Sequence, residues 1–177
     1  MKLTYEKSKA CCFTGHRPHK LPYLKDEESP QCIILKKILT ERILEKVLLD
    51  ECDTFLCGMA QGVDMICAGL VLELRKMIDM PLRLICVVPY REQAKNWGQD
   101  AEKRYREILK QGDSKILISG EYTATCLMER NRYMVDHASH MIAVCGGDGG
   151  SKYTLDYARK KDTSIILINP QTLSVVE

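Results

Sequence analysis

Six short apolar runs recur along the chain, each uncharged at its centre and bounded by Gly, Pro or Asn. Runs of this length and composition are typical of strands that are buried on both faces of a parallel sheet. The six runs lie at residues 9–13, 54–57, 82–88, 115–118, 141–145 and 164–168.

Helical periodicity fills the intervals between these runs. The clearest stripe of apolar positions begins at Val63, repeats at spacings of three and four residues, and ends before Pro81. Such a stripe predicts a helix with one face on the core. Four further helical patterns lie at residues 35–47, 97–108, 126–136 and 151–160.

Strands that alternate with helices pair in parallel through right-handed crossovers, which predicts a doubly wound α/β sheet. We therefore expect one Rossmann-like domain over residues 1–177, with three layers, a mainly parallel sheet and helices on both faces. Ligands of such folds bind beyond the carboxyl ends of the strands, near the point where the strand order reverses. The loops that follow strands are thus the first places to seek a site.

Composition narrows the classes of partner. Basic residues number 26 and acidic residues 24, a net charge of +2, so no electrostatic footprint for nucleic acid or an anionic membrane surface is present. No apolar run approaches the roughly 18 residues that span a bilayer, and the first ten residues are too polar for a signal peptide. We expect a cytoplasmic protein with neither a membrane nor a nucleic acid partner; a homodimer is left open.

The use of the nine cysteines is consistent with the expected cytoplasmic location. Cys57, Cys86 and Cys145 stand inside apolar runs, where cysteine serves as a small hydrophobe in proteins of a reducing compartment. No Cys-x-x-Cys pair occurs, which removes the commonest zinc and thiol-redox signatures. His137 and His140 stand near Cys145, but they fit a helix end and a strand start better than a metal site, so no metal is expected.

Three loops that follow strands carry candidate chemistry. The first is Thr14-Gly15-His16-Arg17-Pro18. Gly15 permits a sharp turn or the close approach of a ligand, His16 can donate or accept a proton, and Arg17 presents a planar fork of donors to phosphate or carboxylate. The alternative is a tight turn with solvated polar side chains.

The second loop joins the strand at 54–57 to the strongest helical pattern. Its candidate binding residues are Gly58, Met59, Ala60, Gly62 and Asp64. Free N–H groups at a helix N-terminus would attract an anion. Equally, the glycines would only permit close packing of strand against helix, and Asp64 favours the helix dipole in either case. Both interpretations stay open.

The third loop has four glycines in five positions directly after the run at 141–145. So many glycines are costly in conformational entropy, and an ordinary connection does not need them. Exposed N–H groups, with Ser151 as the helix N-cap, would form a nest for phosphate. Neither a P-loop nor a dinucleotide fingerprint is present. The candidates are Gly146, Gly147, Gly149, Gly150 and Ser151.

Two other groups of side chains have both a functional and a structural interpretation. Arg130 and Asn131 belong to a basic segment that would hold a phosphate or lie on a solvated helix face. Tyr90, Glu92 and Trp97 follow the third apolar run. They would form either a stacking wall or part of the core.

The segments 14–18, 57–64, 130–136 and 146–154, in this order, resemble the YpsA-like branch of the SLOG superfamily. This superfamily is the SMF/DprA and LONELY GUY group of Rossmann-like domains. The resemblance runs from about Cys11 to Pro170 and includes the segment 130–136 and the stretch from Gly146 to Thr154. It implies a nucleotide or an ADP-ribose-like ligand held by the glycine-rich loops, with Thr154 among the contact residues, and it identifies no other cofactor. DNA binding as in DprA is disfavoured by the near-neutral charge.

One departure from the resemblance bears on catalysis. LONELY GUY phosphoribohydrolases carry Glu-Arg-Lys and, further on, Pro-Gly-Gly-x-Gly-Thr-x-x-Glu. This chain has Glu129-Arg130-Asn131 in the same register, and Tyr153 stands where those hydrolases have their catalytic glutamate. The phosphate cradle is kept, while the carboxylate is missing.

The expected function is therefore a nucleotide-binding sensor or regulatory module rather than an enzyme. The alternative is an enzyme that cleaves an N-glycosidic or phosphoester bond of a nucleotide. In that case Asp64, Glu92 or Asp148 would supply the carboxylate that Tyr153 cannot.

Overall fold

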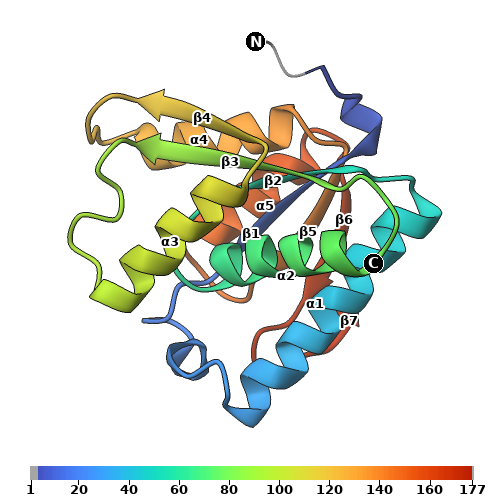
Figure 1. The fold of residues 1–177 in the computed structure, drawn as a ribbon. Helices are drawn as coiled ribbons and strands as arrows, with labels where there is room; N and C mark the ends of the chain where they lie inside the picture. Colours follow the sequence, from blue (N-terminus) through green and yellow to red (C-terminus); the bar gives the residue numbers. More distant parts are fainter. Residues whose placement is uncertain (1–3, 177) are drawn as a thin grey trace.

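The computed structural model describes residues 4–176, and its centre is a seven-stranded sheet (Figure 1). The strands are β1 (Ala10–Gly15), β2 (Thr54–Cys57), β3 (Arg83–Tyr90), β4 (Ser114–Ser119), β5 (His140–Val144), β6 (Ser164–Ile168) and β7 (Val175–Val176). Their order across the sheet is β4-β3-β2-β1-β5-β6-β7. All neighbours pair in parallel except β6 and β7.

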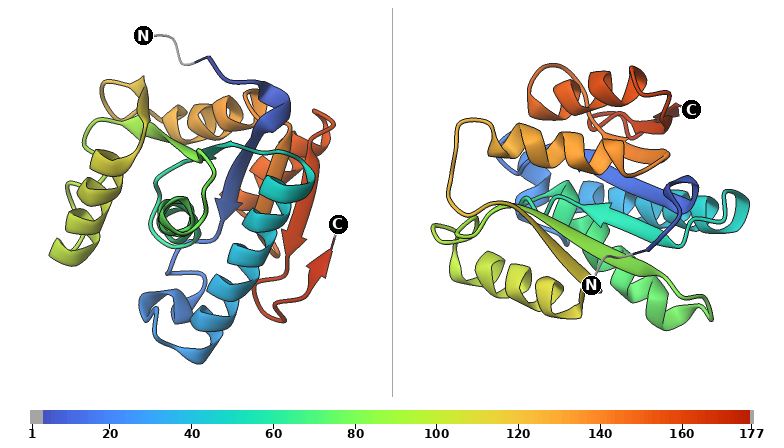
Figure 2. Two further views of the ribbon diagram at one scale, coloured as in Figure 1. Left: turned by 45° about the vertical axis from the view of Figure 1, so that its right-hand side comes forward. Right: turned by 90° about the horizontal axis from the view of Figure 1, so that it is seen from above.

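Helices cover both faces of this sheet, which confirms the expected fold class. Within the described residues the α-helices are α1 (Pro30–Leu49), α2 (Val63–Met77), α3 (Gln99–Gln111), α4 (Cys126–Asp136) and α5 (Gly150–Arg159). Helices α1, α2 and α3 pack on one face, and α4 and α5 pack on the other (Figure 2). None of these five helices has both the length and the apolar character that a bilayer crossing requires.

The central strands divide their side chains between two cores, one on each face. In β1, Cys11 and Phe13 belong to the core under α1, α2 and α3, whereas Ala10 and Cys12 belong to the core under α4 and α5. Phe13 stacks on Phe55 of β2, with ring centroids 5.8 Å apart. All nine cysteines are buried and free, as expected for cysteine used as a small hydrophobe.

One predicted strand, β4, departs from the expectation of burial on both faces, and one strand, β7, was not predicted. Strand β4 forms one edge of the sheet, so its side chains alternate between partly buried and exposed, and Leu117 faces solvent while Ile116 and Ile118 pack against the core. Strand β7 was not predicted, because two exposed residues at the other edge carry no apolar pattern. The alternation of β4 is the pattern of a half-covered strand.

The segment between β1 and α1 is tied to the body of the protein. It contains a 3-10 turn, η2 (Pro22–Lys25), in which the Tyr23 hydroxyl donates to the Pro170 carbonyl (2.7 Å). Glu27 pairs with Lys36 of α1 (2.8 Å) and with Arg104 of α3. These links hold the segment beside the carboxyl ends of the strands.

The strand order reverses between β1 and β5. From β1 the chain goes on to β2 on one side, whereas β5 leads to β6 on the other. The helices that follow, α1 and α5, lie on opposite faces of the sheet (Figure 2). Their departure in opposite directions leaves a crevice at the carboxyl ends of β1 and β5, the usual ligand position in such sheets.

Gly15 ends β1 where α2 begins, and it provides a test of this packing. A Cβ atom at this position would lie 2.7 Å from Cγ2 of Val63. Because strand and helix are both held by the core, we expect Gly15→Ala to lower the free energy of unfolding by about 1–3 kcal/mol, measured by urea denaturation.

Gly120→Ala is the matched control. A Cβ atom there would meet nothing within 4 Å, so its effect should stay within about 0.5 kcal/mol. Equal losses in the two variants would contradict the close contact of β1 with α2.

Candidate functional site

A cavity of about 300 Å³, here named the first chamber, opens at the carboxyl end of β1 and the N-terminus of α5. The three predicted loops and α4 all contribute to its wall. The predicted residues that line it are Thr14, Gly15, His16, Arg17, Ala60, Asp64, Arg130, Asn131, Gly149, Gly150 and Ser151. Residues from four separate segments of the sequence thus converge on one space.

The first and third loops are joined by the buried His16 ring. His16 Nε2 lies 2.8 Å from the Gly146 carbonyl oxygen and 3.1 Å from the Gly146 nitrogen, and the tautomer of the ring decides which of these two groups it bonds. The His16 backbone N–H also donates to the Val144 carbonyl (3.2 Å). His16 therefore holds the loop after β1 against the loop after β5 and fixes the floor of the chamber.

The N-cap of α5 lies two residues before the predicted one. Gly149 is the N-cap, with a φ of 118° that favours glycine, and the helix begins at Gly150. The prediction of Ser151 as N-cap is wrong, because the backbone of Gly149 already directs the chain into the helix. Ser151 lies in the first turn, where N–H groups have no partner within the helix, and it lines the chamber.

A buried ion pair connects α4 with the start of α2, and a hydrogen bond connects α4 with the loop after β2. Arg130 is 4% exposed, and its Nη1 donates to the Gly58 carbonyl and lies 3.9 Å from Asp64 Oδ2. Arg130 Nε donates to Asn131 Oδ1 (2.7 Å). Asp64 is 6% exposed and accepts a hydrogen bond from the Ala60 N–H (3.3 Å). Each charge thus has at least one hydrogen bond as well as its opposite charge.

Burial sets the protonation tendencies of this pair. Removal from water raises the pKa of the Asp64 carboxyl, against the opposing effects of the Arg130 guanidinium, the Ala60 N–H and Arg17. Burial lowers the pKa of Arg130, and Asp64 opposes that shift. The opposite charge of each partner lowers the free-energy cost of burying the other in its charged form.

The two glycines of the second loop serve close packing. A Cβ atom on Gly58 would collide with Arg130 and would lie 2.8 Å from Asp64 Oδ2. Gly62 has a φ of 93°, and its Cβ atom would lie 2.7 Å from the His16 carbonyl oxygen. Of the two interpretations of this loop, packing accounts for both glycines, and Asp64 itself lies at the N-terminus of α2.

Several predicted binding residues do not line the first chamber. The Met59 side chain is buried in the core, and its carbonyl accepts a hydrogen bond from Gln93 (3.1 Å). Thr154 is buried, and its hydroxyl donates to the Gly150 carbonyl within α5 (2.9 Å). The predicted residues that do not line the chamber are Gly58, Met59, Gly62, Gly146, Gly147 and Thr154.

Sequence reasoning missed four residues of the wall, Phe13, His19, Lys20 and Leu127, of which Phe13 was expected only as part of a buried strand. His19 and Lys20 extend the polar run after Thr14, a signal that was available in the sequence. Lys20 Nζ donates to the Asp148 carbonyl (2.5 Å) and so reaches the third loop. Leu127 gave no signal, because its position depends on how α4 docks on the sheet.

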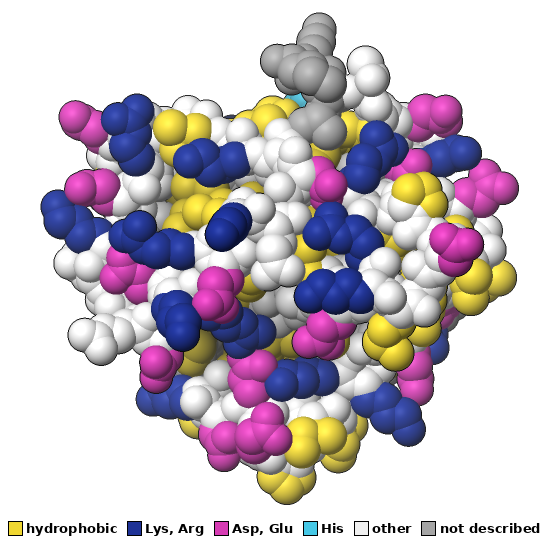
Figure 3. Space-filling view, viewed as in Figure 1, with side chains coloured by type: hydrophobic (Ala, Val, Ile, Leu, Met, Phe, Trp, Pro, Cys, Tyr) yellow, Lys and Arg dark blue, Asp and Glu magenta, His cyan; other side chains and the backbone are white. Residues whose placement is uncertain are grey.

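The wall of the first chamber carries more positive than negative charge. Among the described residues that line it, Arg17, Lys20 and Arg130 are cationic, and one residue, Asp64, is anionic. The molecular face in Figure 3, in contrast, shows Lys and Arg interspersed with Asp and Glu. The cationic excess on the chamber wall favours an anionic ligand.

The residues proposed to replace a catalytic glutamate do not come together. Glu92 pairs with Lys95 (3.2 Å) and lines a separate hollow beside α3. Asp148 is exposed and does not line the chamber, and the Tyr153 hydroxyl accepts from Arg132 Nε (2.8 Å). Of the three candidate carboxylates, Asp64 alone lies on the chamber wall.

The two histidines considered for a metal site bond to the backbone instead. His137 is the C-cap of α4, and its Nδ1 lies 2.8 Å from the Tyr133 carbonyl oxygen. His140 begins β5, and its Nε2 lies 3.0 Å from the Ser8 carbonyl oxygen. Their predicted positions at a helix end and a strand start are confirmed.

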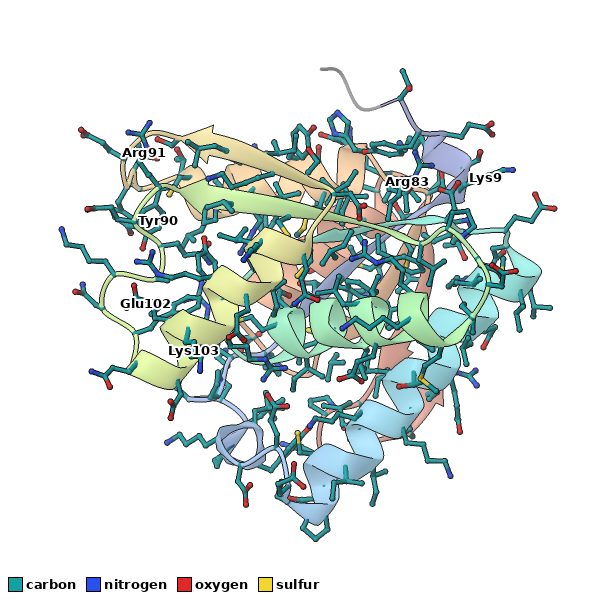
Figure 4. The ribbon with its side chains drawn as sticks, viewed as in Figure 1. Lys9, Arg83, Tyr90, Arg91, Glu102 and Lys103 are labelled. Carbon is teal, nitrogen blue, oxygen red and sulfur yellow. The ribbon has the colours of Figure 1, made fainter. Side chains whose placement is uncertain are left out.

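A second cavity of about 470 Å³, here named the second chamber, adjoins the first and shares Arg17, His19 and Leu127 with it. Tyr90 and Trp97 line it, so both belong to a cavity wall. Figure 4 shows Tyr90 at the end of β3 remote from Arg83, the carboxyl end.

Comparison with known proteins gives a family match over most of the chain. The model of the YspA SLOG family matches residues 11–173. A UPF0398 protein of Lysinibacillus sphaericus is 28% identical over 173 residues, covering 92% of this chain and 94% of that protein. The prophage-derived protein YoqJ of Bacillus subtilis is 28% identical over 146 residues, covering 75% of this chain and 85% of its own.

Solved structures with the same fold include two DNA processing proteins A. The protein from Streptococcus pneumoniae has a TM-score of 0.61 at 16% identity, with 90% of this chain aligned to 50% of that one. The protein from Helicobacter pylori, whose structure is titled for its single-stranded DNA binding mode, has a TM-score of 0.57 at 15% identity. The latter match covers 92% of this chain and 66% of that one.

The ion pair of Arg130 with Asp64 leads to a pH-dependent prediction. Arg130→Met keeps most of the side-chain volume but leaves Asp64 buried without its cation. We expect a loss of about 3–5 kcal/mol in the free energy of unfolding at pH 7, measured by urea denaturation.

This loss should shrink on acidification. The folded pKa of Asp64 already lies above its unfolded value and rises further without Arg130, so the carboxyl is protonated in the folded variant as pH falls through that raised value. The penalty is least below the unfolded pKa of about 3.9. The double variant Asp64→Asn/Arg130→Met should lack this pH dependence, and a loss that is constant with pH in the single variant would contradict the assignment.

Proposed function

We propose that this chain, which belongs to the YspA SLOG family, is a binding module for a nucleotide or a nucleotide derivative whose phosphate lies in the first chamber. The observation that carries the proposal is the pairing of a cationic wall with the N-terminus of α5. Unpaired N–H groups at a helix start and nearby cations together form a favourable site for phosphate.

The residues of the chamber divide into two sets by their freedom to bind. Arg17 and Lys20 are exposed, and although Lys20 Nζ donates one hydrogen bond to the Asp148 carbonyl, its ammonium group has further donors for a phosphate. Arg130 is already committed to Gly58 and Asp64, so its charge contributes to the field of the chamber while its donors hold the loop after β2. The first-turn N–H groups of Gly150 and Ser151 would supply the fixed hydrogen bonds.

The position of Asp64 is compatible with the alternative that this protein is an enzyme. A buried carboxyl with a raised pKa on a cavity wall is the kind of group that serves as general acid. However, Asp64 also neutralises Arg130 and accepts from the Ala60 N–H. These structural roles favour binding without turnover.

Single-stranded DNA is a further candidate ligand, favoured by the fold shared with the Helicobacter pylori protein. The net charge of +2, and the interspersed charges on the face shown in Figure 3, weigh against it. A labelled oligonucleotide therefore belongs in the same binding experiment as the nucleotides, where saturable binding tighter than that of any mononucleotide would favour the DNA assignment.

Replacing Arg17 tests the phosphate site. We expect Arg17→Ala to weaken the binding of AMP and ADP-ribose by about 1.5–3 kcal/mol, the worth of a charge-assisted contact, measured by titration calorimetry. Stability should be unchanged, because the side chain is exposed. The control is Arg106→Ala on α3, whose guanidinium lies on the surface away from the chamber. Failure of every phosphate compound to bind, or equal weakening by both variants, would refute the proposal.

The absence of turnover is the second prediction for this site. We expect purified protein to release no ribose 5-phosphate from nucleoside monophosphates at an enzymatic rate, because loss of a general acid–base group costs about 10²–10⁴ in rate. Chromatography of the free base after incubation with AMP measures it. Turnover that disappears in Asp64→Asn, while AMP still binds, would establish the enzymatic alternative.

A further inference from the structure

The first chamber lies between the N-termini of two helices that pack on opposite faces of the sheet (Figure 2). Gly150 and Ser151 reach its wall from the first turn of α5, and Asp64 reaches it from the first turn of α2. A phosphate anion is attracted to the free N–H groups of α5 and repelled by the Asp64 carboxylate. A ligand that fills the chamber therefore needs a different chemical group beside Asp64.

Asp64 has one carboxylate oxygen that the protein itself does not use. Its Oδ2 accepts a hydrogen bond from the Ala60 N–H (3.3 Å) and lies 3.9 Å from Arg130 Nη1. Its Oδ1 has no hydrogen-bond partner among residues 4–176, and it is not one of the unpaired polar atoms that are shut off from solvent. Asp64 is 6% exposed and lines the first chamber. Oδ1 is therefore an acceptor that opens into this chamber.

Thr14 places a hydroxyl group in the same part of the chamber. Thr14 is also 6% exposed and lines the first chamber. Its hydroxyl has no hydrogen-bond partner within residues 4–176, and it too is not shut off from solvent. Thr14 and Asp64 adjoin in sequence two residues that touch, because a Cβ atom on Gly15 would lie 2.7 Å from Cγ2 of Val63. Two side chains, each more than nine-tenths buried, thus turn polar atoms toward one space.

The charges around these atoms narrow the group that they can bind. Arg17, Lys20 and Arg130 on the same wall disfavour an ammonium group, and the Asp64 carboxylate disfavours an anion. An apolar group would leave the carboxylate oxygen without a donor, which is costly. A neutral hydroxyl donates to a carboxylate and also accepts from another hydroxyl. Two adjacent hydroxyls would therefore suit Asp64 and Thr14 together.

We propose that the first chamber recognises a pair of adjacent hydroxyl groups beside the phosphate, as in the ribose of a ribonucleotide. One hydroxyl would donate to Asp64 Oδ1, and its neighbour would bond with the Thr14 hydroxyl. The inference rests on the proposed function, since the phosphate of the same ligand would lie at the N-terminus of α5. It favours ribonucleotides over single-stranded DNA, because the sugars within a DNA strand have no free pair of hydroxyls.

Removing the two hydroxyls from the ligand tests this diol site. AMP and 2′,3′-dideoxyadenosine 5′-monophosphate share the base and the phosphate and differ only in these hydroxyls. We expect the wild type to bind the dideoxy compound about 10- to 100-fold more weakly than AMP, because a hydrogen bond to a charged group is lost. Titration calorimetry measures both affinities. Equal affinity for the two compounds would overturn the diol site and leave the phosphate site intact.

Thr14→Val removes the hydroxyl from the protein and nearly preserves the shape of the side chain. The variant should bind AMP about three- to tenfold more weakly and the dideoxy compound as the wild type does. Urea denaturation should show a folded protein, because the lost hydroxyl has no partner within residues 4–176. The control is Thr54→Val, since Thr54 is a buried strand threonine at the opposite end of the sheet, beside Ala10. It should bind both compounds as the wild type does.

The outcomes separate the diol site from the proposed function. A Thr14→Val variant that weakens both compounds equally, or that leaves the affinity for AMP unchanged, would overturn the diol site. Failure of both compounds to bind the wild type would overturn the proposed function and the diol site with it. A loss of affinity that is confined to AMP, and that occurs in Thr14→Val but not in Thr54→Val, would support the assignment.

Discussion

The hydrogen bond between the His16 ring and the Gly146 backbone holds the geometry on which the rest of the site depends. Strands β1 and β5 are neighbours in the sheet, yet the helices that follow them lie on opposite faces. Without a link at their carboxyl ends the two loops would be free to diverge. The buried imidazole of His16 joins the two loops, and it keeps the glycine-rich turn before α5 facing the loops that follow β1 and β2.

The fold was predictable from sequence because its strongest determinants are local. Apolar runs and helical stripes are repeated along the chain, and parallel connectivity follows from their alternation. The edge strands were less predictable: the burial of β4 on one face depends on its place in the sheet order. Likewise, Ser151 resembled an N-cap in sequence, but the positive φ of Gly149 became visible only in three dimensions.

The candidate site was predictable in part, for the same reason. Most residues of the first chamber follow strands, so the sheet topology brought them together as expected. The roles within the set were not predictable, since Arg130 contacts Gly58 and Asp64 across long separations in sequence. Gln93 and Tyr122 line the second chamber from different loops, and this wall exists only because β3 and β4 are adjacent.

The interior of this protein is rich in sulfur that takes no part in the site. Burial raises the pKa of Cys57 well above its usual range and that of Cys86 to about 12. Thiols attack disulfides, peroxides and electrophiles as thiolates, and that form is scarce when the pKa is high and solvent is excluded. The two cores therefore resist oxidants while the native state persists. The same nine side chains become nine reactive groups once the chain unfolds, so oxidative damage would report on unfolding rather than on the environment of the folded protein.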